Sequence, residues 1–193
     1  MSTTLRLLGR PELRAGTHGV RLLAERRYQL LALLGASAGQ WLPRDALATL
    51  LWPDHAQSAA RRNLRKVIFS SRAVPGTQAL EVTDDALRWP VDCDLKVFEQ
   101  AVRERRHADA VALGGQPLLQ GIDDPTNAAF SDWLALQRTR VADAWQAAAH
   151  EQLRSAQALD AAARLALAQA LLAHDALDES ALAVLMQVAV ATC

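Results

Sequence analysis

The chain has 193 residues, 51% of them hydrophobic, and a formal net charge of zero, which excludes a disordered protein and allows one or two folded domains. Its two cysteines, Cys93 and Cys193, lie far apart without a Cys-x-x-Cys motif, which excludes a disulfide framework and a structural zinc site. The first residues lack the long apolar core of a signal peptide, and no apolar run reaches the length of a membrane span. We therefore expect a cytoplasmic protein without a membrane partner.

The zero net charge conceals a difference between the two halves of the chain. Residues 1–90 hold 13 basic and 7 acidic side chains, whereas residues 91–193 hold 8 basic and 14 acidic ones. A basic half beside an acidic half favours nucleic acid as the partner of the first half and another role for the second. Chance partition beside an acidic helical domain is the alternative on composition alone.

The N-terminal part of the chain has the pattern of short strands followed by helices. Alternating runs separated by glycine-containing turns predict three strands, at 4–8, 12–14 and 20–22. A helical pattern over 28–34 follows and ends in glycines. A second helix opens at Pro43, because proline costs little at the start of a helix.

The segment 57–73 predicts a helix with an apolar stripe and a basic back. At 3.6 residues per turn, one narrow arc of this helix holds Ala60, Leu64, Val67, Ile68 and Ser71. The opposite side presents Arg62, Lys66 and Phe69, with flanks formed by Arg61, Arg65 and Arg72 and by Asn63 and Ser70. A helix that packs one side on a core and offers arginine, lysine and asparagine outward fits a DNA major groove. A basic face that only meets solvent is the alternative.

Residues 80–89 predict a hairpin after this helix. Two alternating runs, 80–82 and 87–89, are joined by the polar turn Thr83-Asp84-Asp85-Ala86. Strands, three helices and then a hairpin are the element order of a winged helix with an N-terminal sheet. We therefore expect an α+β winged-helix DNA-binding domain over 1–92, with the helix around 57–73 as recognition helix and the hairpin as wing.

Everything from Val91 onward has a helical pattern, which predicts an all-α domain over 93–193. The expected helices lie at 93–106, 109–119, 127–155, 159–174 and 179–192. The last two are rich in alanine and form one helix pair that resembles a tetratricopeptide-type repeat. Trp133 and Trp145 are expected to be packing anchors. An apolar run at 189–191 indicates that the helical domain is truncated at its C-terminus, or that its end packs on itself or on a partner.

Several segments resemble a known family of bacterial regulators. The run WPDHAQSAARRNLRKVIFSSR, residues 52–72, is similar to the second-to-third helix segment of SARP-type bacterial transcriptional activators, which carry an OmpR-type winged helix. The segments ALRWPVDCDLKVFEQAV, FSDWLALQRTRVADAW and ALLAHDALDESALAVLM resemble the bacterial transcriptional activator domain that follows the winged helix in that family. The resemblance covers nearly the whole chain and departs from the family pattern at Ser70, Ser71 and Pro75.

The resemblance implies a bacterial, sequence-specific DNA-binding transcriptional regulator that acts as an activator. It would bind double-stranded promoter DNA as a homodimer on direct repeats, and its helical domain would contact RNA polymerase, the winged helix or another protomer. The alternative function is a protein-interaction module of a larger signalling protein, with the helical repeats as the partner-binding surface. The salt dependence of binding to random-sequence DNA separates the two.

Side chains on the outer face of the 57–73 helix are the candidates for reading bases. Arg62 and Lys66 can each donate to guanine O6 or N7. Asn63 can pair with adenine, and Ser70 lies on the same flank. Phe69 either touches a thymine methyl group or is buried under the wing.

The flanking cations are expected to meet phosphates. Arg61, Arg65 and Arg72 would fix the register of the helix without reading sequence. On the wing, Arg88 and the Thr83 hydroxyl would reach an adjacent groove or the DNA backbone. One or two of these arginines are expected to pair instead with Asp or Glu inside the domain.

The sequence contains no pattern typical of an enzyme. The five histidines are scattered without metal-ligand spacing, and there is no GxxxxGK[ST] phosphate-binding loop. The acidic pairs Asp84-Asp85 and Asp123-Asp124 lie in predicted turns, where aspartate is favoured for backbone reasons. We therefore expect no catalytic residue, no metal ligand and no cofactor.

Overall fold

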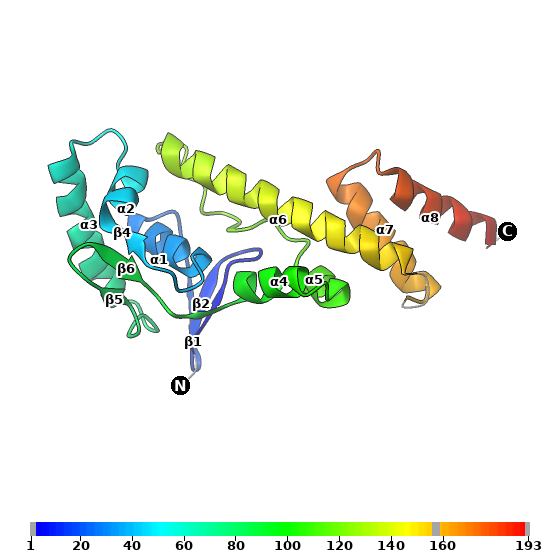
Figure 1. The fold of residues 1–193 in the computed structure, drawn as a ribbon, viewed down its shortest axis with the longest axis horizontal. Helices are drawn as coiled ribbons and strands as arrows, with labels where there is room; N and C mark the ends of the chain where they lie inside the picture. Colours follow the sequence, from blue (N-terminus) through cyan, green and yellow to red (C-terminus); the bar gives the residue numbers. More distant parts are fainter. Residues whose placement is uncertain (1–2, 156–158, 192–193) are drawn as a thin grey trace. The chain divides into compact units, whose positions relative to one another are not determined.

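In the computed structural model, a small N-terminal sheet is followed by helices and then by a helical C-terminal region (Figure 1). The structure describes residues 3–155 and 159–191. The chain divides into two compact units, Met1–Val97 with Gln116–Thr139, and Phe98–Gly115 with Arg140–Cys193. The division expected between residues 92 and 93 does not coincide with these units, because the chain returns to the first unit after residue 115.

The N-terminal sheet has four strands in the order β3-β2-β1-β7. β1 (Thr3–Arg6), β2 (Glu12–Ala15) and β3 (His18–Arg21) are antiparallel neighbours, and they lie where the sequence predicts strands. β7 (Asp92–Cys93) pairs with β1 in parallel. This last strand was not predicted, because two residues are too few to show a period.

Asp94 is the first residue of α4 (Asp94–Arg103), and its carboxylate binds the backbone just after β1. It accepts backbone N–H groups from Leu7 at 2.7 Å, Leu8 at 3.1 Å and Leu95 at 2.8 Å. Burial raises the pKa of Asp94, and these backbone donors only partly oppose the rise. The first strand therefore stops at residue 6, two residues before its expected end.

Three helices follow the sheet in the first unit, α1 (Arg26–Ala36), α2 (Arg44–Leu51) and α3 (Gln57–Arg72), as the sequence predicts. α3 packs on both α1 and α2. α1 lies so close to the sheet that a Cβ atom on Gly35 would overlap Cδ2 of Leu5. Glycine at this position allows the close contact, and α1 ends one residue later.

A second sheet has the strand order β4-β6-β5. β5 (Glu81–Val82) and β6 (Ala86–Arg88) pair antiparallel where a hairpin is expected, with Val82 opposite Leu87. β4 (Leu42–Pro43), just before α2, pairs with β6. The short β4 had no recognisable pattern in the sequence, but it ties the hairpin to the start of α2.

The second unit is helical. It contains the end of α4, α5 (His107–Leu113), the later part of α6 (Ala128–Arg154), α7 (Ala161–His174) and α8 (Glu179–Ala191). α7 and α8 pack on each other. Thr192, where the last helix was expected to end, and Cys193 lie outside the described residues. None of the helices seen in residues 3–155 and 159–191 is long and apolar enough to cross a membrane.

Trp145 is a packing anchor of the second unit, as expected. Its side chain is buried, its ring lies 4.7 Å from that of His174, and its Nε1 donates to the carbonyl of Val111 at 3.3 Å. A Cβ atom on Gly114 would overlap the Trp145 ring. Gly114 also leaves the helical conformation, which is why the helix expected at 109–119 ends at residue 113.

Candidate nucleic-acid interface

α3 buries the apolar stripe that its periodicity predicts. Ala60, Leu64 and Ile68 are buried where α3 packs on α1 and α2. Ser71 is fully buried, and its hydroxyl donates to a backbone carbonyl of α1 at 3.4 Å. Val67 is half-buried and forms the edge of the stripe. The opposite side of α3 consequently faces away from the core.

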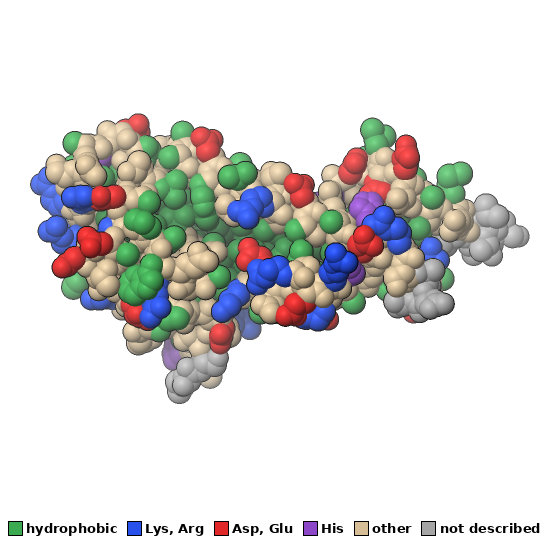
Figure 2. All heavy atoms as spheres, in the orientation of Figure 1, with side chains coloured by type: hydrophobic (Ala, Val, Ile, Leu, Met, Phe, Trp, Pro, Cys, Tyr) green, Lys and Arg blue, Asp and Glu red, His purple; other side chains and the backbone are tan. Residues whose placement is uncertain are grey.

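The outer side of α3 is strongly basic. Four cations there are exposed and have no ion-pair partner within residues 3–155 and 159–191: Arg62, Arg65, Lys66 and Arg72. The sequence of α3 contains no acidic residue. Lysine and arginine side chains gather over α3 in Figure 2, beside acidic side chains. A row of cations on one helix attracts a polyanion.

Phe69 lies among these cations with 82% of its surface exposed. Burial under the hairpin, one of its two expected environments, is therefore wrong. Lys66 and Arg72 are three residues away on either side, so they neighbour Phe69 on the helix surface. The ring stands at the centre of the basic face, where a helix in a major groove meets base edges.

Arg61 forms an ion pair with another residue of the protein. Its Nε and Nη2 atoms donate to the two carboxylate oxygens of Asp45 in α2, each at 2.5 Å. This hydrogen bonding lowers the pKa of Asp45 and raises that of Arg61. About half of each side chain is exposed, so the pair lies in solvent. Arg61 is one of the arginines expected to pair within the domain.

The hairpin residues expected to contact DNA are bound within the hairpin. Arg88 contacts Glu81 through Nε at 2.9 Å and Nη2 at 2.8 Å, and its guanidinium lies 4.7 Å from the centre of the Trp41 ring. The Thr83 hydroxyl accepts the N–H of Ala86 at 3.0 Å and donates to its carbonyl at 3.1 Å. Arg88 is thus a second arginine paired within the domain.

Arg44, at the start of α2, was not singled out from the sequence. Its Nη1 donates to the carbonyls of Thr83 at 3.0 Å and Asp84 at 3.3 Å, and its backbone N–H donates to Asp85 O at 2.8 Å. These bonds fix the tip of the hairpin to α2. Arg44 is a single basic residue after Pro43, and nothing in the sequence around it indicates contact with a hairpin about forty residues further along the chain.

A cleft of about 410 Å³ lies between the start of α2, α3 and the hairpin tip. Both charge signs line it, and its three carboxylates belong to Asp45, Asp84 and Asp85. Carboxylates repel phosphate oxygens. Three arginines also line the cleft and balance these carboxylates: Arg44, Arg61 and Arg65. Among the described residues, the side of α3 that carries Arg62 and Phe69 has no carboxylate from this cleft and is the more basic of the two sides.

Asn63 and Ser70 lie at the border between the buried stripe and the outer face. Both are half-buried. The Ser70 hydroxyl donates to the carbonyl of Val67 at 3.0 Å, inside its own helix. These two residues are therefore less accessible than the cations on the other flank.

The chain also contains a buried thiol and residue types that can bind metal ions. Burial raises the pKa of the Cys93 thiol to about 12, so this thiol stays protonated near neutral pH. In the part of the chain that the structure describes, no cluster of three or more His, Cys, Asp or Glu residues could hold a metal ion.

Comparison with known proteins agrees with this architecture. No family model matches the sequence. No curated protein matches it either. The chain is similar in fold to EmbR. The structure of Mycobacterium tuberculosis EmbR in complex with a low-affinity phosphopeptide matches 96% of this chain with a TM-score of 0.61 and 18% sequence identity.

The match covers 54% of the EmbR chain, so this protein spans about half of that chain's length. At 18% identity the likeness concerns the fold alone. It supports the expected architecture of a small N-terminal sheet, helices and a helical C-terminal region.

Proposed function

We propose that this protein is a sequence-specific DNA-binding transcriptional regulator that reads promoter DNA with α3. The observation that carries the proposal is the outer face of α3, with four exposed cations and no acidic residue in the helix. A basic face that only meets solvent is commonly balanced by acidic residues three or four positions away. That balance is missing from α3, which favours a polyanionic partner.

The side chains have different roles in this proposal. Arg62 and Lys66, at the centre of the outer face, donate to guanine edges, and Phe69 contacts a thymine methyl group. Arg65 and Arg72, on the flank, contact phosphates and fix the register.

The remaining members of the predicted set contribute less. Arg61 and Arg88 reach DNA only by leaving Asp45 and Glu81, respectively. The hairpin, with Thr83, serves as a wing whose tip is held by α2. Asn63 and Ser70 contact DNA only at the edge of the interface, because both are half-buried.

The helical region over 93–193 is proposed to be the activating part, with Gln116–Thr139 of it belonging to the first compact unit. By resemblance, it contacts RNA polymerase, and the protein binds direct repeats as a homodimer. The fold shared with EmbR supports a regulator of this kind.

The proposal is tested by selecting genomic fragments that bind the full chain and measuring variants on the tightest one. Arg62→Ala should weaken binding by about 1–3 kcal/mol and relax the preference at one base pair. Arg72→Ala is the matched control, because it removes the same charge from the flank and should weaken all sequences alike. Equal losses on every sequence for both variants would contradict the reading role of Arg62.

If the chain selects no fragment and binding to random DNA does not depend on salt, the DNA-binding proposal is wrong. The protein-interaction module expected as the alternative then becomes the better account of the helical region.

A further inference from the structure

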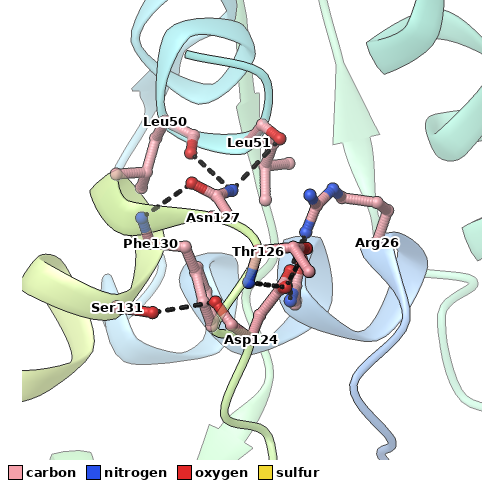
Figure 3. Close-up of polar contacts among 9 residues, drawn as sticks. Arg26, Leu50, Leu51, Asp124, Thr126, Asn127, Phe130 and Ser131 are labelled. Carbon is pink, nitrogen blue, oxygen red and sulfur yellow. Dashed lines mark hydrogen bonds and ion pairs between the residues drawn. The ribbon is translucent and has the colours of Figure 1, made fainter. Parts of the chain in front are cut away.

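The corner between α2 and α3 is closed by a side chain from far along the sequence. α2 ends at Leu51, and α3 begins at Gln57. The last carbonyl groups of a helix have no partner within it. Those of Leu50 and Leu51 accept hydrogen bonds from Nδ2 of Asn127, at 3.1 and 3.2 Å. Figure 3 shows the Asn127 amide between these carbonyls and the start of α6.

The same side chain begins α6. Oδ1 of Asn127 accepts the N–H of Phe130 at 3.1 Å, the bond that an N-cap residue makes. Only 1% of Asn127 is exposed, so water does not replace these bonds. One buried amide therefore caps the end of α2 and the start of α6 together.

The loop that carries Asn127 is fixed to α1. The carboxylate of Asp124 accepts hydrogen bonds from two α1 residues, Arg26 and Gln29, the second at 2.9 Å. The Ser131 hydroxyl donates to the carbonyl of Asp124 at 2.9 Å. The loop is thus bonded to α1 through Asp124 and to α6 through Asn127, and Asn127 joins it to the end of α2.

α3 has a weaker support at its own start. Ala56 is its N-cap residue, and no side chain in the described part of the chain caps this end. The first turn is held by backbone bonds from Ala59 and Ala60 to the carbonyl of Ala56, at 2.9 and 3.0 Å. The buried stripe of α3 packs on α1 and α2, so the direction of α3 follows that of α2, whose end Asn127 holds.

We propose that Asn127 is a positioning residue for DNA reading, which fixes the α2–α3 corner and thereby aims the outer face of α3. The inference rests on the proposed function of α3. Asn127 acts through Leu50 and Leu51 rather than by touching DNA. Because Asn127 also caps the start of α6, it links the start of α6 to α3 through the end of α2.

The test compares Asn127→Ser with Ser131→Ala in the full chain, well below the melting temperature of either. Serine still caps α6 but is too short to reach the α2 carbonyls, whereas Ser131→Ala removes another bond of the same loop and leaves both caps intact. Asn127→Ser should bind the selected fragment about tenfold more weakly and with flattened base preferences. Hydrogen exchange at the amides of Trp52 and His55 should also rise. Ser131→Ala should keep the affinity, preferences and exchange of the wild type.

Wild-type affinity and base preferences in Asn127→Ser would overturn the inference, and so would an equal loss in Ser131→Ala. Asn127→Asp is a second variant, in which an oxygen faces the two carbonyls, and it should lose at least as much affinity as Asn127→Ser. If the wild type binds no DNA, the proposed function fails, and exchange at the corner still decides whether Asn127 holds it. Unchanged hydrogen exchange at Trp52 and His55 in both Asn127→Ser and Asn127→Asp would show that Asn127 does not hold the α2–α3 corner, and would refute the inference.

Discussion

Replacing Asp45 with alanine should strengthen the attraction of α3 for DNA phosphates. Asp45 holds Arg61 through two hydrogen bonds of 2.5 Å on an exposed surface. An exposed ion pair adds little to stability. The substitution therefore frees one cation and removes one anion beside α3, while the buried stripe of the helix stays intact.

The size of the effect follows from the number of phosphates contacted. Each phosphate neutralised on duplex DNA adds about −0.9 to the slope of log affinity against log salt concentration. Arg61 would join the four cations of α3 that have no ion-pair partner in the described residues, so the slope should steepen by about 0.9. Between about 50 and 200 mM salt, the variant should lose roughly threefold more affinity than the wild type.

The assay is fluorescence anisotropy with a labelled random-sequence duplex across that salt range. Asp132→Ala is the matched control, because Asp132 is exposed on α6 in the same unit and its removal changes the net charge equally. The control should leave the slope unchanged. An unchanged slope in Asp45→Ala, or an equal steepening in Asp132→Ala, would refute the idea that Asp45 withholds Arg61 from phosphate.

Three further changes test other parts of the structure. Phe69→Ala should alter stability by less than about 0.5 kcal/mol, since the ring is 82% exposed, yet weaken binding to the selected fragment at one A·T pair; full affinity there excludes the thymine contact. Burial alone would raise the pKa of Asp124, but hydrogen bonds, the largest from Gln29, lower it to about 2. Because the folded-state pKa is depressed, this stabilisation is complete above about pH 4 and is lost as pH falls through about 2. Asp124→Asn should therefore reduce the free energy of unfolding by about 2 kcal/mol at neutral pH, and urea titrations should show the difference vanishing in acid; a difference independent of pH contradicts this. Gly114→Ala should destabilise the protein by about 1–3 kcal/mol, because the added methyl group overlaps Trp145, and an unchanged melting temperature would exclude that packing.

The faces of α3 could be predicted from the sequence because they depend only on helical periodicity. Ala60, Leu64 and Ile68 are buried, and Arg62 and Lys66 are exposed, as a period of 3.6 residues requires. The environment of Phe69 could not be predicted in this way. An aromatic residue on an outer face is equally compatible with solvent and with cover from a hairpin, so the position of the hairpin had to be known.

The polar contacts that shape the site could not be predicted, because they join residues distant in sequence. The bond from Arg61 to Asp45 spans 16 positions, and those from Asn127 to Leu50 and Leu51 span 77 and 76. An asparagine before a helix signals an N-cap but does not show which other helix its amide reaches. The return of residues 116–139 to the first unit was missed for the same reason.

The central claim, that α3 is a DNA-binding helix, is tested most directly by the salt dependence of binding to random-sequence duplex DNA. On random-sequence DNA, where Arg62 and Lys66 have no specific bases to read, all four exposed cations of α3 should meet phosphates, and the wild type should give a slope of roughly −3 to −4 for log affinity against log salt concentration. Replacing Arg62, Arg65, Lys66 and Arg72 together with glutamine should bring the slope close to zero. A flat wild-type dependence, or a slope that survives the fourfold replacement, would contradict the claim.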